Sequence, residues 1–335
     1  MSYKIGSFNV RNLSWGAVGS RNLDKIAEII KRYDIIALQE VLSEGKILEG
    51  PDLKSVEGQA KAYEYSLRSR LGDNWEMCWL DPKTSSKWYP YLGDDSRGEG
   101  YVFIWRSDKF SCPLNEKGNE IRPRIIHQYK TDSKVGEMKL MRDPAYGRFR
   151  LNSMPNFEVR LITTHIIFGK PSADNLNREV DFGSITMRQN EFNVLARSIY
   201  TSISDDHVDV DAVVPYTIIL GDYNLNLRES GITTANVPGV LIVDSQKRIV
   251  PTNEVGMRDG TYIIKTQQAD LSTMNKDADN YVSNYDHFSF DTRTEQNIVR
   301  GRPHRLSVAE EMSSYKEYRD TVSDHIPIML EIDLK

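Results

Sequence analysis

The sequence has little cysteine and no long apolar run, and both absences narrow the class of protein. Only 2 cysteines occur among 335 residues, Cys78 and Cys112, and they form no Cys-X-X-Cys pair, so a thiolate zinc site is excluded. No apolar run approaches the roughly 18 residues of a membrane-spanning helix, so we expect no membrane partner. The chain also begins without an apolar leader, and we therefore expect a cytoplasmic protein with both thiols reduced.

A surplus of positive charge is missing as well. The net charge is −5, which argues against a protein that coats nucleic acid nonspecifically. A negative net charge does not exclude a nuclease, because acidic metal ligands make the net charge more negative and a bound cation offsets this. One segment differs from the rest: residues 121–150 hold eight Lys or Arg against three acids. This segment is either a surface that faces phosphate groups or an ordinary solvated loop.

The remaining composition is that of a globular protein with a sizeable core. Hydrophobic residues make up 39% and charged residues 27% of the chain. There is no internal repeat, low-complexity tract or linker-like stretch. Helices are predicted over residues 20–33, 57–70 and 186–203, and short strands recur from end to end. This pattern favours a single domain, residues 1–335, with two stacked sheets and outer helices.

The stretch from Ile218 to Asn224 combines a buried strand with polar residues at its end. Three apolar residues run into Gly221, which permits a tight turn or a close backbone approach. Asp222 and Asn224 then leave the strand on the same side, because strand side chains alternate. A carboxylate and an amide there suit a hard cation or a phosphate under attack. An Asp-X-Asn turn without any function is the alternative.

Other predicted strands end in polar side chains too. Asn9 lies in the strand predicted over residues 4–10, and Glu40 ends the one predicted over 34–40. Each residue alone is ambiguous, since buried amides are often structural and terminal carboxylates are usually solvated. The full set is Asn9, Glu40, Glu99, His165, Asp222, Asn224, Asp286, Asp324 and His325. These side chains would converge if the sheets stack with the strand ends on one edge.

Five short motifs in this set resemble the endonuclease/exonuclease/phosphatase superfamily. They are Phe8-Asn9-Val10, Leu38-Gln39-Glu40-Val41, His165, Gly221-Asp222-Tyr223-Asn224 and Ser323-Asp324-His325-Ile326-Pro327. They occur in the family's order and span nearly the whole chain. The resemblance implies an α/β fold built as a four-layered sandwich, with two mixed β-sheets packed face to face and helices on the outer faces.

Within that superfamily the sequence looks most like the deoxyribonuclease I branch. The strand from Glu99 through Tyr101 to Arg106 resembles the branch's Glu-X-Tyr-X-Phe-X-X-Arg strand. Arg142-Asp143-Pro144-Ala145 resembles its Arg-Glu-Pro-Ala element, whose arginine contacts DNA, and Tyr285-Asp286 resembles its Tyr-Asp pair. Arg97 stands near the place of the tyrosine that enters the DNA minor groove. The resemblance therefore implies that Arg142, Arg97 and Tyr101 bind substrate.

The implied activity is metal-dependent phosphodiester hydrolysis, with DNA as the expected substrate of an endonuclease. A phosphoesterase of the same fold acting on a phosphoinositide, sphingolipid or nucleotide is the alternative, and a binding protein with an inactive site is a third. Oxygen ligands without thiolate favour Mg²⁺, Mn²⁺ or Ca²⁺, and we expect Mg²⁺.

Roles for the site residues also follow from the resemblance. Glu40, Asn9 and Asp324 are the predicted metal residues. His165 and His325 form the acid/base pair, faced by Glu99 and Asp286 respectively. Asp222 and Asn224 position the attacking water and the phosphate.

Overall fold

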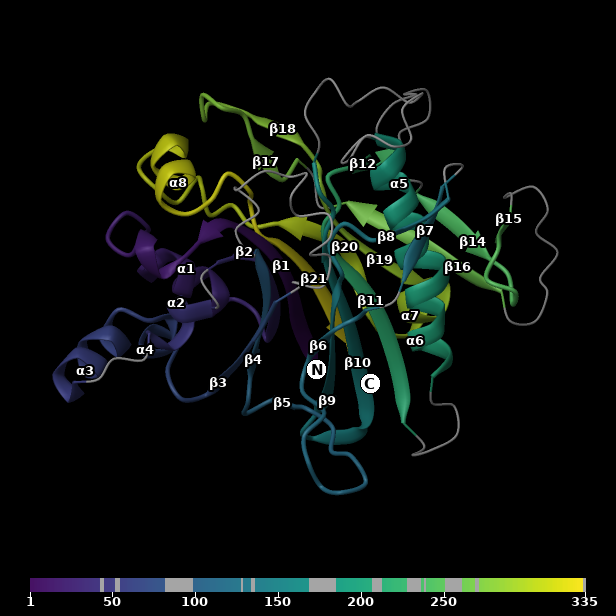
Figure 1. The fold of residues 1–335 in the computed structure, drawn as a ribbon, viewed down its shortest axis with the longest axis horizontal. Helices are drawn as coiled ribbons and strands as arrows, with labels where there is room; N and C mark the ends of the chain where they lie inside the picture. Colours follow the sequence, from purple (N-terminus) through teal and green to yellow (C-terminus); the bar gives the residue numbers. More distant parts are fainter. Residues whose placement is uncertain are drawn as a thin grey trace.

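Two β-sheets packed against each other form the centre of the computed structural model of the chain (Figure 1). The structure describes residues 1–42, 45–51, 55–81, 99–127, 129–133, 136–168, 185–206, 213–227, 236–237, 239–250, 261–268 and 271–333. The first sheet has six strands in the order β20 (Val299–Arg305), β21 (Ile328–Asp333), β1 (Ser2–Leu13), β2 (Ile35–Val41), β4 (Gly100–Arg106) and β3 (Trp75–Leu80).

The second sheet has nine strands. Its order is β15 (Ile249–Val250), β14 (Val240–Val243), β16 (Tyr262–Gln268), β19 (Asp286–Asp291), β11 (Val214–Asp222), β10 (Met154–His165), β9 (Ala145–Leu151) and β5 (Phe110–Ser111), and β6 (Arg124–Ile125) also pairs with β9. Three small pairs complete the strands: β7 (Lys130–Ser133) with β8 (Gly136–Lys139), β12 (Asn226–Leu227) with β13 (Asn236–Val237), and β17 (Thr273–Met274) with β18 (Tyr281–Ser283).

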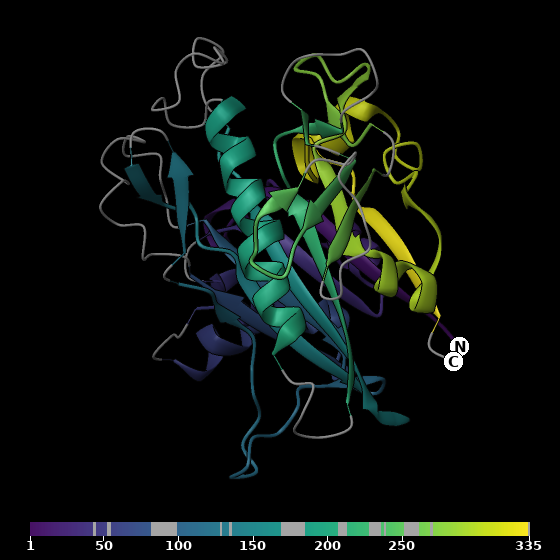
Figure 2. The same cartoon turned by 90° about the vertical axis from the view of Figure 1, so that its right-hand side faces the viewer.

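Helices cover the outer face of each sheet (Figures 1 and 2). The first sheet is flanked by η1 (Trp15–Ala17), α1 (Leu23–Ile30), α2 (Lys46–Glu49), α3 (Val56–Glu64), α4 (Leu67–Leu71) and α8 (Tyr315–Thr321). The second is flanked by the continuous helical segment α5 (Ile185–Val194), η6 (Leu195–Tyr200) and α6 (Thr201–Asp205), and α7 (Thr292–Ile298) packs near β16 and β19. In the part of the chain described, no helix is long and apolar enough to cross a membrane.

Alternation of side chains along the central strands produces the layers. In β1, Ile5 belongs to the apolar core between the sheets, whereas Phe8 packs with the helices outside the first sheet. In β11, Ile218 faces the core between the sheets and Ile219 faces the segment α5–η6. Each strand therefore buries both faces, which explains the nearly continuous apolar runs. The predicted four-layered α/β sandwich is confirmed.

The register of the central strands brings their polar ends to one edge. β1 and β2 are parallel, with Asn9 beside Gln39. β10 and β11 are also parallel, with His165 beside Asp222, and antiparallel β19 places Asp286 on the other side of Asp222. Residues that lie far apart in the sequence thus become neighbours through backbone pairing alone.

Two details of the predicted helices were wrong. The helix predicted over residues 20–33 is shorter, since α1 begins at Leu23 and ends at Ile30. Asn22 caps its start, because the Asn22 side chain accepts a 2.9 Å hydrogen bond from the Lys25 amide. The helix predicted over 57–70 is two helices, α3 and α4. They separate because the Ser66 hydroxyl accepts a hydrogen bond from the Ser69 amide and starts a new helix there.

Candidate active site

The edge at which these strands end contains several strained backbone positions. Arg11, Asn12, Glu40 and Asn224 have φ angles of 47°, 54°, 59° and 49°, a region that side chains other than glycine rarely adopt. Such strain amounts to about 1–3 kcal/mol per residue and is retained where the surrounding structure enforces it. Its concentration at one edge of the sheets is typical of a functional site.

Gly221 lets two strands approach closely beside Asp222. Its φ is +144°, and a Cβ atom there would lie 2.0 Å from the Thr164 carbonyl oxygen on β10. No side chain fits in that space, so this position requires glycine, as the sequence predicts.

Asn9 joins the two carboxylates at the centre of the site. Its Nδ2 donates to Glu40 Oε1 at 2.9 Å and to Asp222 Oδ2 at 3.1 Å. Its Oδ1 accepts from the Arg11 amide, and the Asn12 amide donates to Glu40 Oε2 at 3.0 Å. Asn9 therefore presents its amide nitrogen to both carboxylates and positions them, and its predicted place among the metal residues stays a prediction.

His325 lies between two carboxylates. Its Nδ1 is 2.9 Å from Asp286 Oδ2, and its Nε2 is 3.6 Å from Asp222 Oδ2. Asp286 is in turn held by the Ser272 hydroxyl, which donates to Oδ2 at 2.6 Å. The carboxylate thus fixes the imidazole, whose other nitrogen points into the site.

His165 approaches the same centre from β10. Its Nε2 lies 3.6 Å from both Glu40 Oε1 and Asp222 Oδ2. Its Nδ1 lies 2.5 Å from Arg142 Nη1 and 3.4 Å from Glu99 Oε2, while Arg142 Nη2 pairs with Glu99. Arg142 and Glu99 both lie on the Nδ1 side of the ring, so Nε2 is the nitrogen that faces the two carboxylates.

Three titrating groups of the site are perturbed by their surroundings. Burial opposes the charged form of Glu99, but Arg142 and His165 outweigh it and lower the pKa of Glu99 to about 2. Burial raises the pKa of Asp222. Burial also disfavours the charged form of His325, but Asp286 and Asp222 outweigh it and hold the pKa of His325 well above its usual range. The two carboxylates therefore favour the protonated form of His325.

The donor set fits a divalent cation. Two groups of ligand atoms converge within 4.8 Å: Glu40 with Glu99 and His165, and Asp222 with Asp286 and His325. Asp286 Oδ1 is buried and has no hydrogen-bond partner among the residues that the structure describes. Facing carboxylates in a buried place are costly unless a cation balances them. Oxygen atoms and imidazole nitrogens without thiolate are ligands for a hard or borderline ion.

The remaining predicted residues lie around this centre. Asn224 is buried, and its Nδ2 donates to the Ile166 carbonyl at 2.7 Å, away from Asp222, whose Oδ1 accepts from the Asn224 amide. Asp324 Oδ2 lies 3.5 Å from Arg11 Nε, outside the two groups of ligand atoms. Tyr101 is 1% exposed, and its hydroxyl accepts from the His165 amide. Arg97 lies outside the described residues.

Sequence reasoning missed residues that support the site. Ser272 holds Asp286 but comes from the turn before β17, and no local pattern marks it. Gln39, buried between the sheets, donates to the Thr163 hydroxyl at 2.9 Å and links β2 to β10. Arg11, the partner of Asp324, could have been found, since it directly follows the first motif, Phe8-Asn9-Val10.

Comparison with known proteins identifies the fold. No protein-family model and no curated protein matches the sequence. Among solved structures, an endonuclease/exonuclease/phosphatase from Bacteroides vulgatus is 14% identical with a TM-score of 0.52, and both chains are covered completely. A family protein from Bacteroides thetaiotaomicron is 18% identical with a TM-score of 0.51, over 100% of this chain and 99% of that one. The human Nocturnin catalytic domain, with a bound sulfate anion, is 11% identical with a TM-score of 0.51, over 100% and 95%. The chain has the endonuclease/exonuclease/phosphatase fold.

Proposed function

We propose that this protein is a metal-dependent phosphodiesterase. One observation supports the proposal most: two histidines, each held on its far side by a charged group, point their Nε2 atoms at the same carboxylate, Asp222 Oδ2, from 3.6 Å. A phosphate group placed between them would have a proton donor or acceptor on either side of the scissile bond. Glu40 and Asp222 supply negative charge for a cation beside it.

Each residue has a separate task in this proposal. Glu40, with Asp222 beside it, would hold the cation, and Asn9 keeps these carboxylates in place. When bound, the cation supplies charge neutralisation on the phosphate oxygens. His325, whose protonated form Asp286 and Asp222 favour, would stabilise the developing negative charge and donate a proton. His165 would handle the proton on the opposite side, oriented by Arg142 and Glu99.

DNA is the substrate that we propose, with cleavage inside the chain. The Arg142-Asp143-Pro144-Ala145 and Tyr285-Asp286 motifs support it by their resemblance to the deoxyribonuclease I branch. The competing candidate is a phosphoesterase acting on a small phosphoester. It is favoured by the net charge of −5, which gives no general attraction to nucleic acid.

A substrate panel tests the proposal. The protein is incubated with supercoiled plasmid and Mg²⁺, in parallel with bis-p-nitrophenyl phosphate, a phosphoinositide set and nucleotides. We expect the protein to nick the plasmid, and we expect nicking to stop in excess chelator. Turnover of a phosphoinositide or nucleotide without plasmid nicking would replace DNA by the small-substrate alternative, and no turnover of any substrate would reject the enzyme.

Glu40→Gln tests whether Glu40 holds the cation. Removing one carboxylate charge should raise the Mg²⁺ concentration for half-maximal activity by about 10-fold or more and lower the maximal rate. Glu76→Gln is the matched control, because Glu76 is half-buried and pairs with Trp105, at the end of β4 opposite Glu99. An unchanged metal titration in Glu40→Gln would contradict the assignment.

A further inference from the structure

Two segments of the candidate active site come from opposite ends of the chain. Residues 9–12, near the end of β1, include Asn9 and the strained Arg11. Residues 321–325 begin at the last residue of α8 and end at His325. β1 pairs with β21 only as far as Ser7 and Ile328, so strand pairing does not hold these two segments against each other. Other contacts have to do so.

The Arg21 guanidinium lies between the two segments and donates to both. Its Nη1 donates to the Arg11 carbonyl and its Nη2 to the Val10 carbonyl, each at 2.6 Å. On the other side, Nη2 also donates to the Val322 carbonyl, and Nε donates to the Thr321 carbonyl at 3.2 Å. Two carbonyl oxygens from each segment therefore share one planar guanidinium, which fixes the distance between the segments.

The Ser323 hydroxyl extends this link to His325. It donates to the Asn9 carbonyl at 2.7 Å and accepts from the His325 amide at 3.0 Å. Ser323 directly follows Val322, whose carbonyl is bound by Arg21. Asn9 in turn holds the two carboxylates at the centre of the site. Through these hydrogen bonds, the position of Arg21 affects how the His325 ring lies against the carboxylates.

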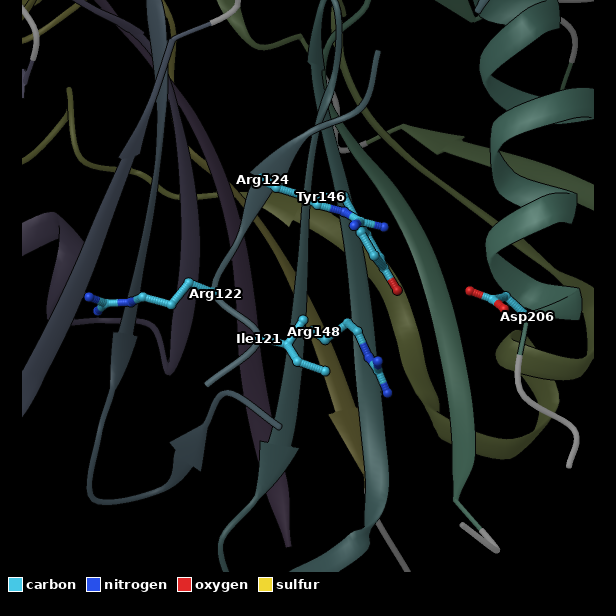
Figure 3. Close-up of a pocket in the computed structure, with 6 residues that line it drawn as sticks. All are labelled: Ile121, Arg122, Arg124, Tyr146, Arg148 and Asp206. Atoms are coloured by element: carbon cyan, nitrogen blue, oxygen red, sulfur yellow. The ribbon is translucent and has the colours of Figure 1, made fainter. Parts of the chain in front are cut away.

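Arg21 differs from an arginine that a carboxylate neutralises. Arg148, which lines a cavity on the outer face of the second sheet (Figure 3), donates to both oxygens of buried Glu158 at 2.8 and 2.9 Å. Within the described residues Arg21 forms no ion pair, and its donors face carbonyl groups. Burial and the neighbouring Arg11 lower the pKa of Arg21 to about 10, so the guanidinium is charged at neutral pH. A charge removed from water without a counter-charge is costly, and the four carbonyl oxygens offset part of that cost.

We propose that Arg21 is a positioning residue for the reaction at this site. By holding residues 9–12 and 321–325 together, it keeps His325 in place against the carboxylates that Asn9 orients. The inference rests on the proposed phosphodiesterase function, because it gives Arg21 a task in that reaction. Four of its five N–H groups bind backbone carbonyls, so we expect Arg21 to affect turnover rather than substrate binding.

Kinetics of Mg²⁺-dependent hydrolysis of bis-p-nitrophenyl phosphate test this task. Arg21→Ala should lower kcat about 10²-fold and leave KM within about 3-fold, because a displacement of about 1 Å among reacting groups has an effect of this size. Arg21→Lys keeps the charge, but one ammonium cannot reach the carbonyls of both segments, so kcat should still fall at least about 10-fold. An unchanged kcat in Arg21→Lys, or a rise in KM alone in Arg21→Ala, would overturn the proposal.

Arg70→Ala is the matched control. Arg70 Nη1 also donates to two backbone carbonyls, those of Glu64 and Ser66, each at 3.0 Å. These carbonyls belong to the helices α3 and α4 on the outer side of the first sheet (Figure 1). The kcat of Arg70→Ala should stay within about 2-fold of the unaltered protein. Equal losses in Arg70→Ala and Arg21→Ala would show a general effect on folding and overturn the proposal.

Free guanidinium ion separates positioning from misfolding. Millimolar guanidinium chloride should raise the kcat of Arg21→Ala at least about 5-fold by occupying the place of the lost side chain, and sodium chloride at the same concentration should not. A misfolded protein would not recover in this way. Recovery that is absent, or equal with the two salts, would overturn the proposal.

Hydrogen exchange distinguishes a failure of this proposal from a failure of the proposed function, because it needs no turnover. In chelator and without substrate, Arg21→Ala should speed amide exchange at least about 10-fold in peptides that cover residues 9–12 and 321–325, whereas Arg70→Ala should not. If the unaltered protein hydrolyses no phosphodiester, the proposed function fails and the task of Arg21 with it. If the unaltered protein hydrolyses bis-p-nitrophenyl phosphate but exchange and kcat are unchanged in Arg21→Ala, only the proposal for Arg21 fails.

Discussion

His325 Nδ1 lies 2.9 Å from Asp286 Oδ2, and the only other carboxylate facing the His325 ring within the described residues is that of Asp222, on the Nε2 side. The Asp286 carboxylate is buried and oriented by Ser272, so it cannot turn away from the ring. This geometry fixes which imidazole nitrogen faces the substrate. It also favours the protonated ring, since Asp286 and Asp222 outweigh the effect of burial and raise the pKa of His325.

Asp286→Asn tests whether this pair acts as a unit. The substitution keeps the shape but removes the charge that holds the His325 ring and its proton. We expect the rate of phosphodiester cleavage to fall about 10²–10⁴-fold. The pKa of His325 should fall as well, so the alkaline limb of the pH–rate profile moves to lower pH. Initial rates across pH, with circular dichroism to check folding, measure both effects.

A double variant of Asp286 and His325 tests whether Asp286 acts only by positioning His325. If Asp286 acts only through His325, then Asp286→Asn with His325→Ala loses no more activity than His325→Ala alone. Losses that multiply would show that Asp286 contributes to catalysis by another route. A wild-type rate in His325→Ala would remove the acid/base role itself.

The sequence predicts the fold and most of the central site because both depend on strand ends. Glu40, His165, Asp222 and Asp286 all end or begin strands whose apolar runs are visible in the sequence. Strand pairing places His165 and Asp286 on either side of Asp222, and the packing of the two sheets brings Glu40 to them. What the motifs leave open is the direction of each side chain. Asp324 and His325 are adjacent, yet Asp324 faces Arg11 and only His325 reaches the centre.

Partners that come from distant loops could not be predicted. Arg142 was expected to grip a phosphate, yet its guanidinium contacts Glu99 and His165 inside the site. Nothing in the local sequence of Arg142 encodes this, because the contact depends on how the segment before β9 crosses the end of β10. The same holds for Glu191 on α5, whose Oε1 accepts the Met141 amide at 2.9 Å and fixes the backbone beside Arg142.

Glu191 should make the stability of the protein depend on pH. Burial raises the pKa of Glu191 to about 7, although the Met141 amide acts in the other direction. The unfolded chain releases this proton near pH 4, so the native state loses stability as the pH rises from about 4 to about 7. Glu191→Gln keeps an acceptor for the Met141 amide without a charge. It should therefore stabilise the protein by about 3 kcal/mol at pH 8 and change little at pH 4.

Thermal unfolding at both pH values measures this difference. Glu120→Gln is the control, because that carboxylate is exposed and its substitution should leave the unfolding temperature within about 1 °C at either pH. A destabilised Glu191→Gln at pH 8 would show that the charged form is the one the fold requires. Activity should be retained in Glu191→Gln, since the backbone beside Arg142 stays in place.

Gly221→Ala should be among the most destabilising single-methyl additions in the chain. The new Cβ would meet the Thr164 carbonyl oxygen at 2.0 Å, and a φ of +144° is unfavourable for alanine. Gly72→Ala separates the two effects, because Gly72 has a φ of +89° with no atom within 4 Å of the added methyl group. We expect Gly72→Ala to lower the free energy of unfolding by about 1–2 kcal/mol, from backbone strain alone. Gly221→Ala should lower it by at least about 3 kcal/mol. Urea denaturation gives both values. Equal losses would mean that β10 and β11 can separate without consequence, and the close approach beside Asp222 would then not be what positions this carboxylate.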